Sequence, residues 1–326
     1  MVQLLDSDIE TREVLDWKGV HLIHYMGSSC SQKVRIFLNL KGIDWESHTI
    51  DLLANENVEP WFLGINPRGL APVLVHNGAV HIESNDIIQY LENVFPEPRL
   101  IPAGHEKEVA ALLKHEDDLH LDLRTLSFRF VFNPPGPPKT PEQLKKYRTN
   151  GTGTVRGHKD GDREIQLEWW ERTAKEGYTD ERTRAAAQKF RAEFASLDER
   201  LAQHPYLLGQ DLTVLDIAWF IYAHRLSLAG YPFARLHPRI DAFVQKLRAT
   251  PGFAKEVATP PEFDAHLAAT RKANLQAGKP WRWWPGSSQR RVNSPAKDLT
   301  TDQVTVDRVL PTAKDSWSPG GIGSPG

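Results

Sequence analysis

The chain has 326 residues, 40% of them hydrophobic and 25% charged, and carries a formal net charge of −2 at pH 7. This near-neutral balance argues against nucleic acid as a partner, and no window approaches the ~18 consecutive apolar residues that a membrane-spanning helix needs. The start, Met1-Val2-Gln3, lacks a basic region and an apolar signal core, and a single cysteine cannot form an internal disulfide. We therefore expect a cytoplasmic, soluble protein.

The first predicted helix begins with hydroxyl groups and the only thiol. Ser28-Ser29-Cys30-Ser31 follows a short apolar strand over 21–25 and precedes an amphipathic helix that runs to about Lys41. Backbone N–H groups at a helix start lack intrahelical partners, so a thiolate held over them is stabilised by roughly 0.3 to 2 kcal/mol. An isolated serine at such a position usually caps the helix and does nothing else. The segment is thus a candidate for sulfur chemistry that needs support from elsewhere in the chain.

Strand and turn signals follow this helix. Pro72 opens a predicted strand, which proline tolerates only at the first strand position or where a cis bond turns the chain. Asn77-Gly78 is the strongest short signal for a β-hairpin. The predicted elements are strands over 43–53, 73–75 and 79–82, and a helix over 87–94 that Glu83-Ser84 opens. Their order is β-α-β followed by β-β-α.

Over about residues 20–102 the chain resembles the thioredoxin-like N-terminal domain of the soluble glutathione transferases. Ser28-Ser29-Cys30-Ser31-x-x-Val34-Arg35 is similar to the zeta-class signature. The resemblance implies that Ser28 faces the glutathione sulfur with Cys30 nearby, whereas the helix-start argument alone also allows Ser29. Lys33 stands where the zeta signature usually has arginine, which weakens assignment to that class more than to the superfamily.

The same resemblance implies how glutathione is bound. Asn66-Pro67-Arg68-Gly69-x-x-Pro72-x-Leu74 is similar to the family's cis-proline loop, so the backbone of Ala71, before a cis Pro72, would grip the cysteinyl part. Glu83-Ser84 is similar to the pair that holds the γ-glutamyl end at a helix N-terminus. Asn57 falls near a position where relatives place a polar side chain on glutathione. Leu70 and Ala71 replace the more usual Gln-Val, so a polar contact is lost at Leu70.

From residue 105 onward the periodicity is helical. We expect long helices over 108–132 and 180–204, and a helix that Thr213 caps with Asp216 at its third position, reaching back as a capping-box glutamate does. The fold class is therefore an α/β thioredoxin-like domain followed by an all-α helical domain. We expect the following division: an N-terminal extension over 1–18, a glutathione-binding domain over 19–103, a helical substrate domain over 104–284, and a disordered tail over 285–326.

A long insert over about 133–180 separates the two long helices. It contains Asn133-Pro134-Pro135-Gly136-Pro137-Pro138, a helix over 140–148, a Gly-rich stretch over 150–162, and Trp169-Trp170. Connections of this length usually form functional lids or mobile segments. The insert resembles that of the bacterial transferases that cleave lignin β-aryl ethers and their fungal relatives, in which it helps to build the pocket for an aromatic substrate. Two further motifs share this resemblance, Trp61-Phe62-x-x-Ile65-Asn66-Pro67-Arg68-Gly69 and Tyr90-Leu91-Glu92-Asn93-Val94-Phe95-Pro96-Glu97.

Other patterns do not support a site. His115 and His120 are five residues apart, whereas zinc on one helix face requires four, so we interpret 115–120 as a solvated acidic turn and expect no metal. The Gly151–Gly157 stretch lacks the strand and the lysine of a phosphate loop and is interpreted as a flexible loop. The tryptophans Trp281, Trp283 and Trp284 are expected to pack against the helical domain.

These observations predict a glutathione transferase whose Ser28 or Ser29 lowers the pKa of the glutathione thiol, with Cys30 the alternative catalytic residue. Glutathione is the co-substrate, an apolar aromatic electrophile the second, and a homodimer the expected assembly. Cleavage of a β-aryl ether is the leading prediction. The alternatives are a zeta-like maleylacetoacetate isomerase, a reductive dehalogenase that uses Cys30, and a non-catalytic glutathione-binding scaffold.

Overall fold

The structure is a computed structural model that describes residues 1–134 and 136–276. The expected tail over 285–326 and the three tryptophans Trp281, Trp283 and Trp284 lie outside the described residues. No helix in the described part of the chain is both long and apolar enough to cross a membrane.

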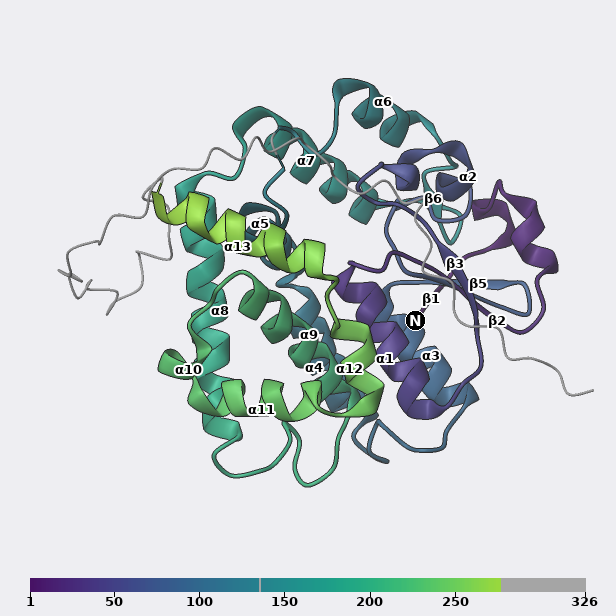
Figure 1. Ribbon diagram of the computed structural model, residues 1–326. Coiled ribbons are helices and arrows are strands. Elements are labelled where there is room, and N and C mark those ends of the chain that lie inside the picture. The colour runs from purple at the N-terminus through teal and green to yellow at the C-terminus, as the bar shows by residue number, and fades with distance from the viewer. Residues whose placement is uncertain (135, 277–326) are drawn as a thin grey trace, which may run out of the picture. The chain divides into compact units, whose positions relative to one another are not determined.

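A five-stranded sheet organises the first part of the chain, in the order β1-β5-β4-β2-β3. Strands β2 and β3 are parallel, and the other neighbours are antiparallel. The strands are β1 (Val2–Gln3), β2 (Val20–His24), β3 (Glu46–Thr49), β4 (Val73–His76) and β5 (Ala79–Ile82). Helices α1 (Ser29–Lys41) and α3 (Ser84–Val94) lie together beside the sheet (Figure 1). This mixed sheet with flanking helices confirms the predicted thioredoxin-like order.

Strand β3 is shorter than the strand predicted over 43–53. Gly42 adopts a left-handed conformation with a φ of 63°, and Ile43 N–H donates to the Leu38 carbonyl at 3.1 Å. These residues therefore close helix α1 instead of pairing in the sheet. After β3 the chain passes through the 3₁₀ turn η3 (Glu56–Val58) and the short helix α2 (Pro60–Leu63) before it reaches the cis-proline loop.

The first 18 residues pack against the sheet. β1 forms its edge, and Leu4, Ile9 and Val14 are buried in one apolar cluster with Ile23 and Val73. Two 3₁₀ turns connect these positions, η1 (Asp6–Asp8) and η2 (Arg12–Asp16). The segment that we expected to be an extension thus contributes to the core of the sheet, and the domain division as a whole remains our proposal.

The single helix predicted over 108–132 is wrong. The structure has α4 (Glu106–Asp117), α5 (His120–Ser127) and a π-helical turn η4 (Phe128–Phe132), with the break at Asp118-Leu119. Asp117 and Asp118 stand at this break, and aspartate is a poor residue for a helix interior because its side chain competes for backbone hydrogen bonds. The predicted solvated acidic turn is also wrong in part, because Glu116 is fully buried and His120 is half-buried.

The helical part centres on α9 (Val214–Leu228), which is buried from Val214 to Leu226 and contacts α1. Its predicted cap is confirmed: the Asp216 carboxylate accepts hydrogen bonds from the Thr213 N–H and hydroxyl, each at 2.8 Å. The remaining helices are α8 (Asp180–Arg200), α10 (Phe233–Leu236), α11 (Pro238–Arg248), α12 (Pro251–Val257) and α13 (Pro261–Gln276). The fold confirms the predicted combination of a thioredoxin-like part and a helical part.

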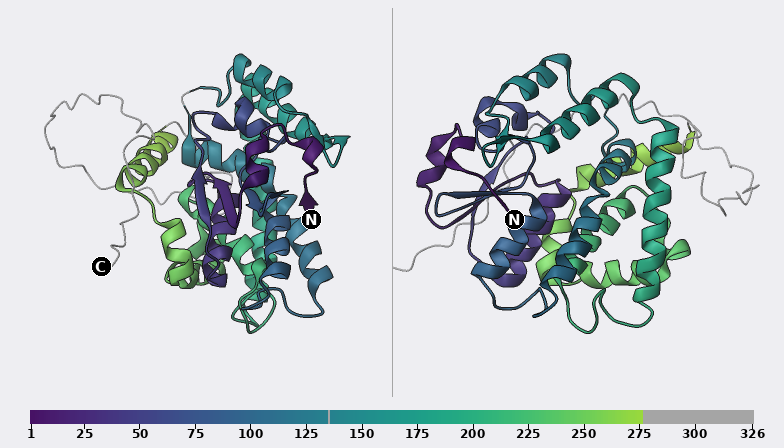
Figure 2. Two further views of the ribbon diagram at one scale, coloured as in Figure 1. Left: turned by 90° about the vertical axis from the view of Figure 1, so that its right-hand side faces the viewer. Right: turned by 180° about the vertical axis from the view of Figure 1, so that it is seen from behind.

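The insert is ordered by contacts with the first half of the chain. It forms α6 (Pro141–Thr149), the hairpin β6 (Thr154–Val155) and β7 (His158–Lys159), and α7 (Gly161–Glu176). Helices α6 and α7 lie side by side, and α6 contacts η3 (Figures 1 and 2). The flexible loop predicted at 151–157 is wrong, because the buried Asp8 carboxylate accepts hydrogen bonds from the N–H groups of Arg156 and Gly157 at 2.7 and 2.9 Å.

Candidate active site

Two serine hydroxyls lie at the start of α1. Ser28 is the N-cap residue, and its Oγ accepts the Ser31 N–H at 3.2 Å. Its own O–H points toward the Ala71 carbonyl at a long 3.5 Å. Ser29 is the first residue of the helix, and its hydroxyl has no hydrogen-bond partner among the described residues. Both serines are half-buried, so each can offer a proton to an anion placed at the helix start.

Cys30 faces a histidine from the helical part of the chain. Its Sγ lies 3.6 Å from His120 Nδ1, which in turn is 3.4 Å from the Tyr222 hydroxyl. Burial raises the pKa of the Cys30 thiol to about 11, although Lys33 acts in the opposite direction. Burial and the charge of Arg124 lower the pKa of His120 to about 4. At neutral pH the pair is therefore a thiol and a neutral imidazole.

Lys33, the departure from the zeta signature, connects three helices. Its fully buried Nζ lies 3.0 Å from Glu116 Oε2 on α4 and 2.7 Å from Asn85 Oδ1 on α3. Burial lowers the pKa of Lys33, but Glu116, Cys30 and Asp117 together raise it, and the net pKa lies above its ordinary value. Lys33 thus stays charged, and it fixes the start of α3 against α1.

The predicted cis bond before Pro72 is confirmed. The loop that carries it is held by amide side chains: Asn66 Nδ2 donates to the Leu70 carbonyl, and Asn57 Nδ2 to the Gly69 carbonyl, both at 2.7 Å. Asn57 is buried, and its Oδ1 finds no hydrogen-bond partner among the described residues. In the structure Asn57 therefore supports the loop that brings Ala71 to Ser28.

Glu83 and Ser84 lie at the N-terminus of α3. Glu83 has a positive φ of 66° and its carboxylate accepts Arg68 Nη1 at 2.7 Å. Burial raises the pKa of Glu83, while Arg68 acts against the rise. Ser84 is buried and its hydroxyl lies close enough to Cys30 to lower the pKa of that thiol. The structure thus brings Ser84 and Cys30 together across α1 and α3.

Arg68 connects Glu83 to the insert. Its Nε donates to Oδ2 of buried Asp160 and its Nη2 to Oδ1 of the same carboxylate, both at 2.9 Å. Nη2 also lies 2.7 Å from Asp162 Oδ2. The Tyr147 hydroxyl donates to the Arg68 carbonyl. Burial lowers the pKa of Arg68, but the hydrogen bonds that it donates to Asp160 and Glu83 raise the pKa above its ordinary value. Arg68 directly precedes Gly69 of the cis-proline loop, so the insert is anchored beside this loop.

Aromatic rings from η4 and from the insert gather next to α5. Phe128, Trp169, Trp170 and Tyr178 pack with ring centroids 4.7 to 6.4 Å apart. Arg124, one turn after His120, lies over Trp169 at 5.1 Å and donates to the Gln166 amide oxygen. No carboxylate in the described residues forms an ion pair with it.

Lys139 is a second basic residue at this cluster, and it is buried. Lys139 is 3% exposed, and its Nζ lies 4.9 Å from the Trp170 ring centroid. The same Nζ donates a hydrogen bond to Asn55 Oδ1. Burial, and then Arg124, lower the pKa of Lys139 to about 7. Sequence reasoning missed His120, Arg124 and Lys139. The only available signal was the spacing of His120 and Arg124 on one helix face.

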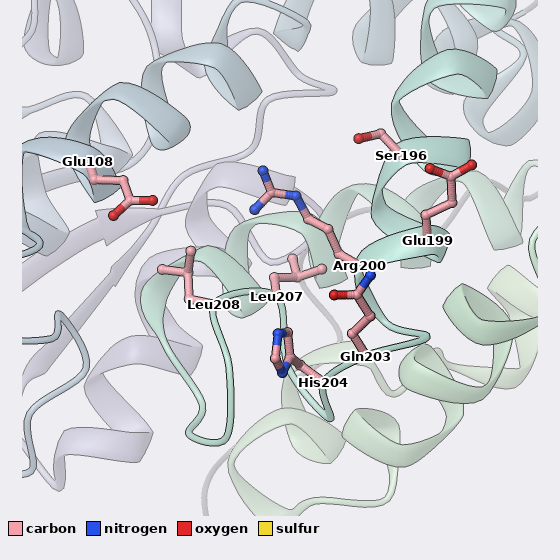
Figure 3. Close-up of a pocket in the computed structure, with 8 residues that line it drawn as sticks. All are labelled: Glu108, Ser196, Glu199, Arg200, Gln203, His204, Leu207 and Leu208. Atoms are coloured by element: carbon pink, nitrogen blue, oxygen red, sulfur yellow. The ribbon is translucent and has the colours of Figure 1, made fainter.

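The described chain also has a surface hollow of about 400 Å³ away from these residues (Figure 3). Side chains of α4 and α8 and of the loop after α8 line it, namely Glu108, Ser196, Glu199, Arg200, Gln203, His204, Leu207 and Leu208. It has no aromatic lining apart from His204 and shares no residue with the α1 start. We therefore place the chemistry at α1 and not in this hollow.

Known proteins resemble the chain in both parts. The model of the glutathione S-transferase N-terminal domain matches residues 22–99, and that of the C-terminal domain matches 167–249. Glutathione S-transferase 1 of Dianthus caryophyllus is 46% identical over 88 residues, 27% of this chain. That match spans only 40% of the relative's own length.

Protein LigF of Sphingobium sp. strain SYK-6 is similar over a longer stretch. It is 28% identical over 221 residues, which cover 65% of this chain and 82% of LigF. The crystal structure titled beta-etherase LigF superimposes with a TM-score of 0.61 at 27% identity, over 73% of this chain and 98% of that one. With the sheet, the cis-proline loop and the serine-led helix in place, these matches show that the chain belongs to the glutathione transferase superfamily, whose co-substrate is glutathione, with zeta-like and LigF-like features.

Proposed function

We propose that the protein uses glutathione to cleave β-aryl ethers. The observation that carries this proposal is the similarity to LigF, which extends through both the N-terminal and the helical part. The zeta-class glutathione S-transferase of Euphorbia esula is 46% identical to the chain, but that match covers only 27% of it. The helical part is where transferases choose their electrophile, so the longer match has more weight for the substrate.

Glutathione would bind along the edges that the N-terminal part presents. The Ala71 backbone would pair with the cysteinyl unit. Ser84, Glu83 and the N-terminus of α3 would hold the charged γ-glutamyl end, because free N–H groups and a helix dipole favour a carboxylate there. Asn57 would act indirectly, since its amide holds the Gly69 carbonyl of the same loop.

The sulfur would then lie over the start of α1. The only acceptor for the Ser28 hydroxyl proton among the described residues is the Ala71 carbonyl, at a long 3.5 Å. The Ser29 hydroxyl has no hydrogen-bond partner among these residues. Both can donate to a thiolate, which is stabilised by such preorganised donors. Cys30 is a neutral thiol with a pKa of about 11, which favours the serines over the cysteine as the activating groups.

The reaction proceeds by displacement. The glutathione thiolate attacks the carbon beside a carbonyl, a C–S bond forms, and the C–O bond to the aryl group breaks with its electron pair going to the oxygen. The products are a glutathione thioether and a phenol, which takes a proton from solvent or from a neighbouring group. The aromatic cluster of Phe128, Trp169, Trp170 and Tyr178 supports an aromatic electrophile. We also propose a homodimer in the cytoplasm.

A second candidate function is isomerisation of a maleylacetoacetate-like substrate. The Ser28-Ser29-Cys30 start and the zeta-class relatives favour it. Arg124 also favours it, because a half-buried guanidinium without a carboxylate partner among the described residues could bind an acidic substrate. In that reaction glutathione adds, a bond rotates and glutathione leaves, so no thioether accumulates.

A panel of three electrophiles tests these functions with the same enzyme and glutathione. We expect the β-aryl ether to give phenol and thioether in equal amounts, and maleylacetone and a chlorinated hydroquinone to turn over much more slowly. The loss of a key hydrogen-bond donor to the anion lowers kcat by about 10² to 10³. Because we assign that role to the serines and not to Cys30, the rate of ether cleavage in Cys30→Ala should stay within about tenfold of the wild-type rate. Turnover of maleylacetone alone would establish the isomerase. Dehalogenation that Cys30→Ala abolishes would establish the reductive route, and tight glutathione binding without any turnover would establish a scaffold.

A further inference from the structure

Three potential metal ligands converge on the edge of the sheet, away from the proposed active site. His21 lies on β2, and Glu46 and His48 lie on the edge strand β3. The register places His21 opposite Glu46, and His48 two residues further along. Residues two apart on a strand share a face, and so do directly paired residues, so all three side chains project from the same face of the sheet.

The distances between their ligand atoms match those of a tetrahedral metal site. His21 Nδ1 and His48 Nε2 are 3.0 Å apart, and the two Glu46 oxygens lie 3.5 Å from His21 Nδ1 and from His48 Nε2. A tetrahedral ion with ligands at about 2.0–2.1 Å separates them by about 3.3 Å. Two imidazole nitrogens and the two carboxylate oxygens of Glu46 thus surround one position that an ion could occupy.

The nitrogen of His21 that faces this position is fixed in the acceptor state. His21 is 6% exposed, and its other nitrogen, Nε2, lies 2.7 Å from the Lys18 carbonyl. A carbonyl only accepts, so Nε2 carries the proton and Nδ1 presents its lone pair. Metal-binding histidines are oriented by this kind of outer hydrogen bond. Trp17 stacks on His48 with centroids 4.3 Å apart and fixes the second ring.

The other histidine–carboxylate pairs of the described chain lack this arrangement. His105 with Glu108 and His115 with Glu193 are single exposed contacts at 2.9 Å, without a second histidine.

We propose that His21, Glu46 and His48 bind a divalent transition metal ion, with Zn²⁺ the best match to two imidazoles and a carboxylate. The exposed Glu46 side leaves the fourth position to water. The ion would tie the short edge strand β3 to β2. This site is separate from the proposed transferase function, and our expectation of no metal considered only the histidines at 115–120.

Calorimetric titration of the full chain with Zn²⁺ tests the proposal. The Cys30→Ala background removes a competing thiol, and glutathione is omitted because it binds zinc. We expect one bound Zn²⁺ per chain and at least about a tenfold weaker affinity in His48→Gln and in Glu46→Gln. His115→Gln, which breaks the separate histidine–carboxylate pair His115–Glu193 of 2.9 Å, should bind Zn²⁺ as the background does.

A thermal melt supplies the second measurement and checks that the variants are folded. Zn²⁺ should raise the Tm of the background and of His115→Gln, and should not raise the Tm of His48→Gln. The proposal is overturned if folded His48→Gln and Glu46→Gln bind Zn²⁺ as tightly as the background. It is also overturned if the background binds none, in which case His21 and His48 form only a hydrogen bond.

Discussion

Residues within one turn of α1 differ in what they can do to sulfur. Ser28 and Ser29 present hydroxyl protons, whereas burial keeps Cys30 in its thiol form with a pKa of about 11. His120, with a pKa of about 4, is neutral at pH 7 and supplies no positive charge that would stabilise a Cys30 thiolate. The chemistry we assign to this turn is therefore donation of hydrogen bonds to an anion that glutathione supplies.

Ser84→Ala should weaken glutathione binding and leave the fold intact. The hydroxyl is expected to bond the γ-glutamyl carboxylate, and a hydrogen bond to a charged group contributes about 1.5–3 kcal/mol, or about 10- to 100-fold in Kd. Titration calorimetry measures the change, with the exposed Ser196→Ala as the control. An unchanged Kd would mean that the γ-glutamyl end binds elsewhere.

Lys139 should make stability depend on pH. Its pKa is about 7 in the folded chain and ~10.4 when unfolded, so between these values the unfolded chain binds one more proton. The free energy of unfolding should therefore rise with pH above 7, and the penalty for the buried charge should be complete below 7. Relative to Lys139→Met, the wild type should gain about 1 to 2 kcal/mol between about pH 7 and 9.

Urea denaturation at several pH values measures this slope. Lys139→Met also removes the hydrogen bond to Asn55. That loss changes the free energy of unfolding by the same amount at every pH, so the slope of this free energy against pH can still be compared. The exposed Lys145→Met is the control and should keep the wild-type slope. Parallel curves for wild type and Lys139→Met would contradict the low pKa.

Single residues were predictable where the signal was local. The Thr213–Asp216 cap and the bond before Pro72 depend on neighbours within a few positions, and both are confirmed. The contact of Cys30 with His120 joins residues 90 apart in sequence. No periodicity encodes such a pair, so it could be found only in the folded chain.

At the scale of elements, the insert is held through Arg68. This guanidinium contacts Asp160 at the start of α7 and Glu83 at the start of α3, so the insert and the predicted glutathione site share one buried charge. Gly69 follows it directly: with a φ of 62° and Tyr147 2.9 Å from where a Cβ would stand, it has no room for a side chain. Helix α6 therefore closes directly over the cis-proline loop.

Asp160→Asn should loosen this anchor while keeping the cap of α7. Asparagine caps a helix as well as aspartate, so the Arg163 N–H that Asp160 accepts at 2.9 Å stays satisfied. The buried ion pair is lost, and we expect a destabilisation of about 1–3 kcal/mol. The KM for glutathione should rise more than kcat falls, because Arg68 would hold Glu83 less firmly.

Asp162→Asn is the matched control, since Asp162 contacts the same guanidinium but its side chain is 58% exposed. It should cost no more than about 1 kcal/mol. Equal effects of the two variants on stability and on KM would show that the insert is not anchored through the buried pair. Urea denaturation and steady-state kinetics provide both readouts.

Among the elements, the helix over 108–132 shows why sequence patterns failed. Its apolar spacing continues through the break at Asp118-Leu119, so periodicity alone predicts one helix. The acidic neighbours of Glu116 predict a solvated side chain, whereas its burial depends on two residues distant in sequence, Lys33 and Asn85. The insert hairpin was missed for a similar reason, since its hydrogen-bond acceptor is Asp8.

At the scale of the whole molecule, the two halves meet where α1 packs against α9 and α12. Arg35, buried on α1, forms an ion pair of 2.5 Å with Glu256 on α12. The candidate serines Ser28 and Ser29 lie at the start of α1. Because α9 and α12 pack against α1, the helical part of the chain fixes the orientation of these serines. The fold class was predictable because three local motifs occur in the family's order, but this packing was not.

The central claim is that the start of α1 activates the glutathione thiol. Its most direct test is the thiol pKa of bound glutathione, followed by thiolate absorbance in a pH titration of the complex. Cys30→Ala should serve as the background, so that only the glutathione sulfur is observed. We predict that bound glutathione ionises well below the ~8.5 of a free thiol, and that Ser28→Ala with Ser29→Ala returns the pKa toward that value. A bound thiol with the free pKa, or a low pKa that survives loss of both serines, would contradict the account.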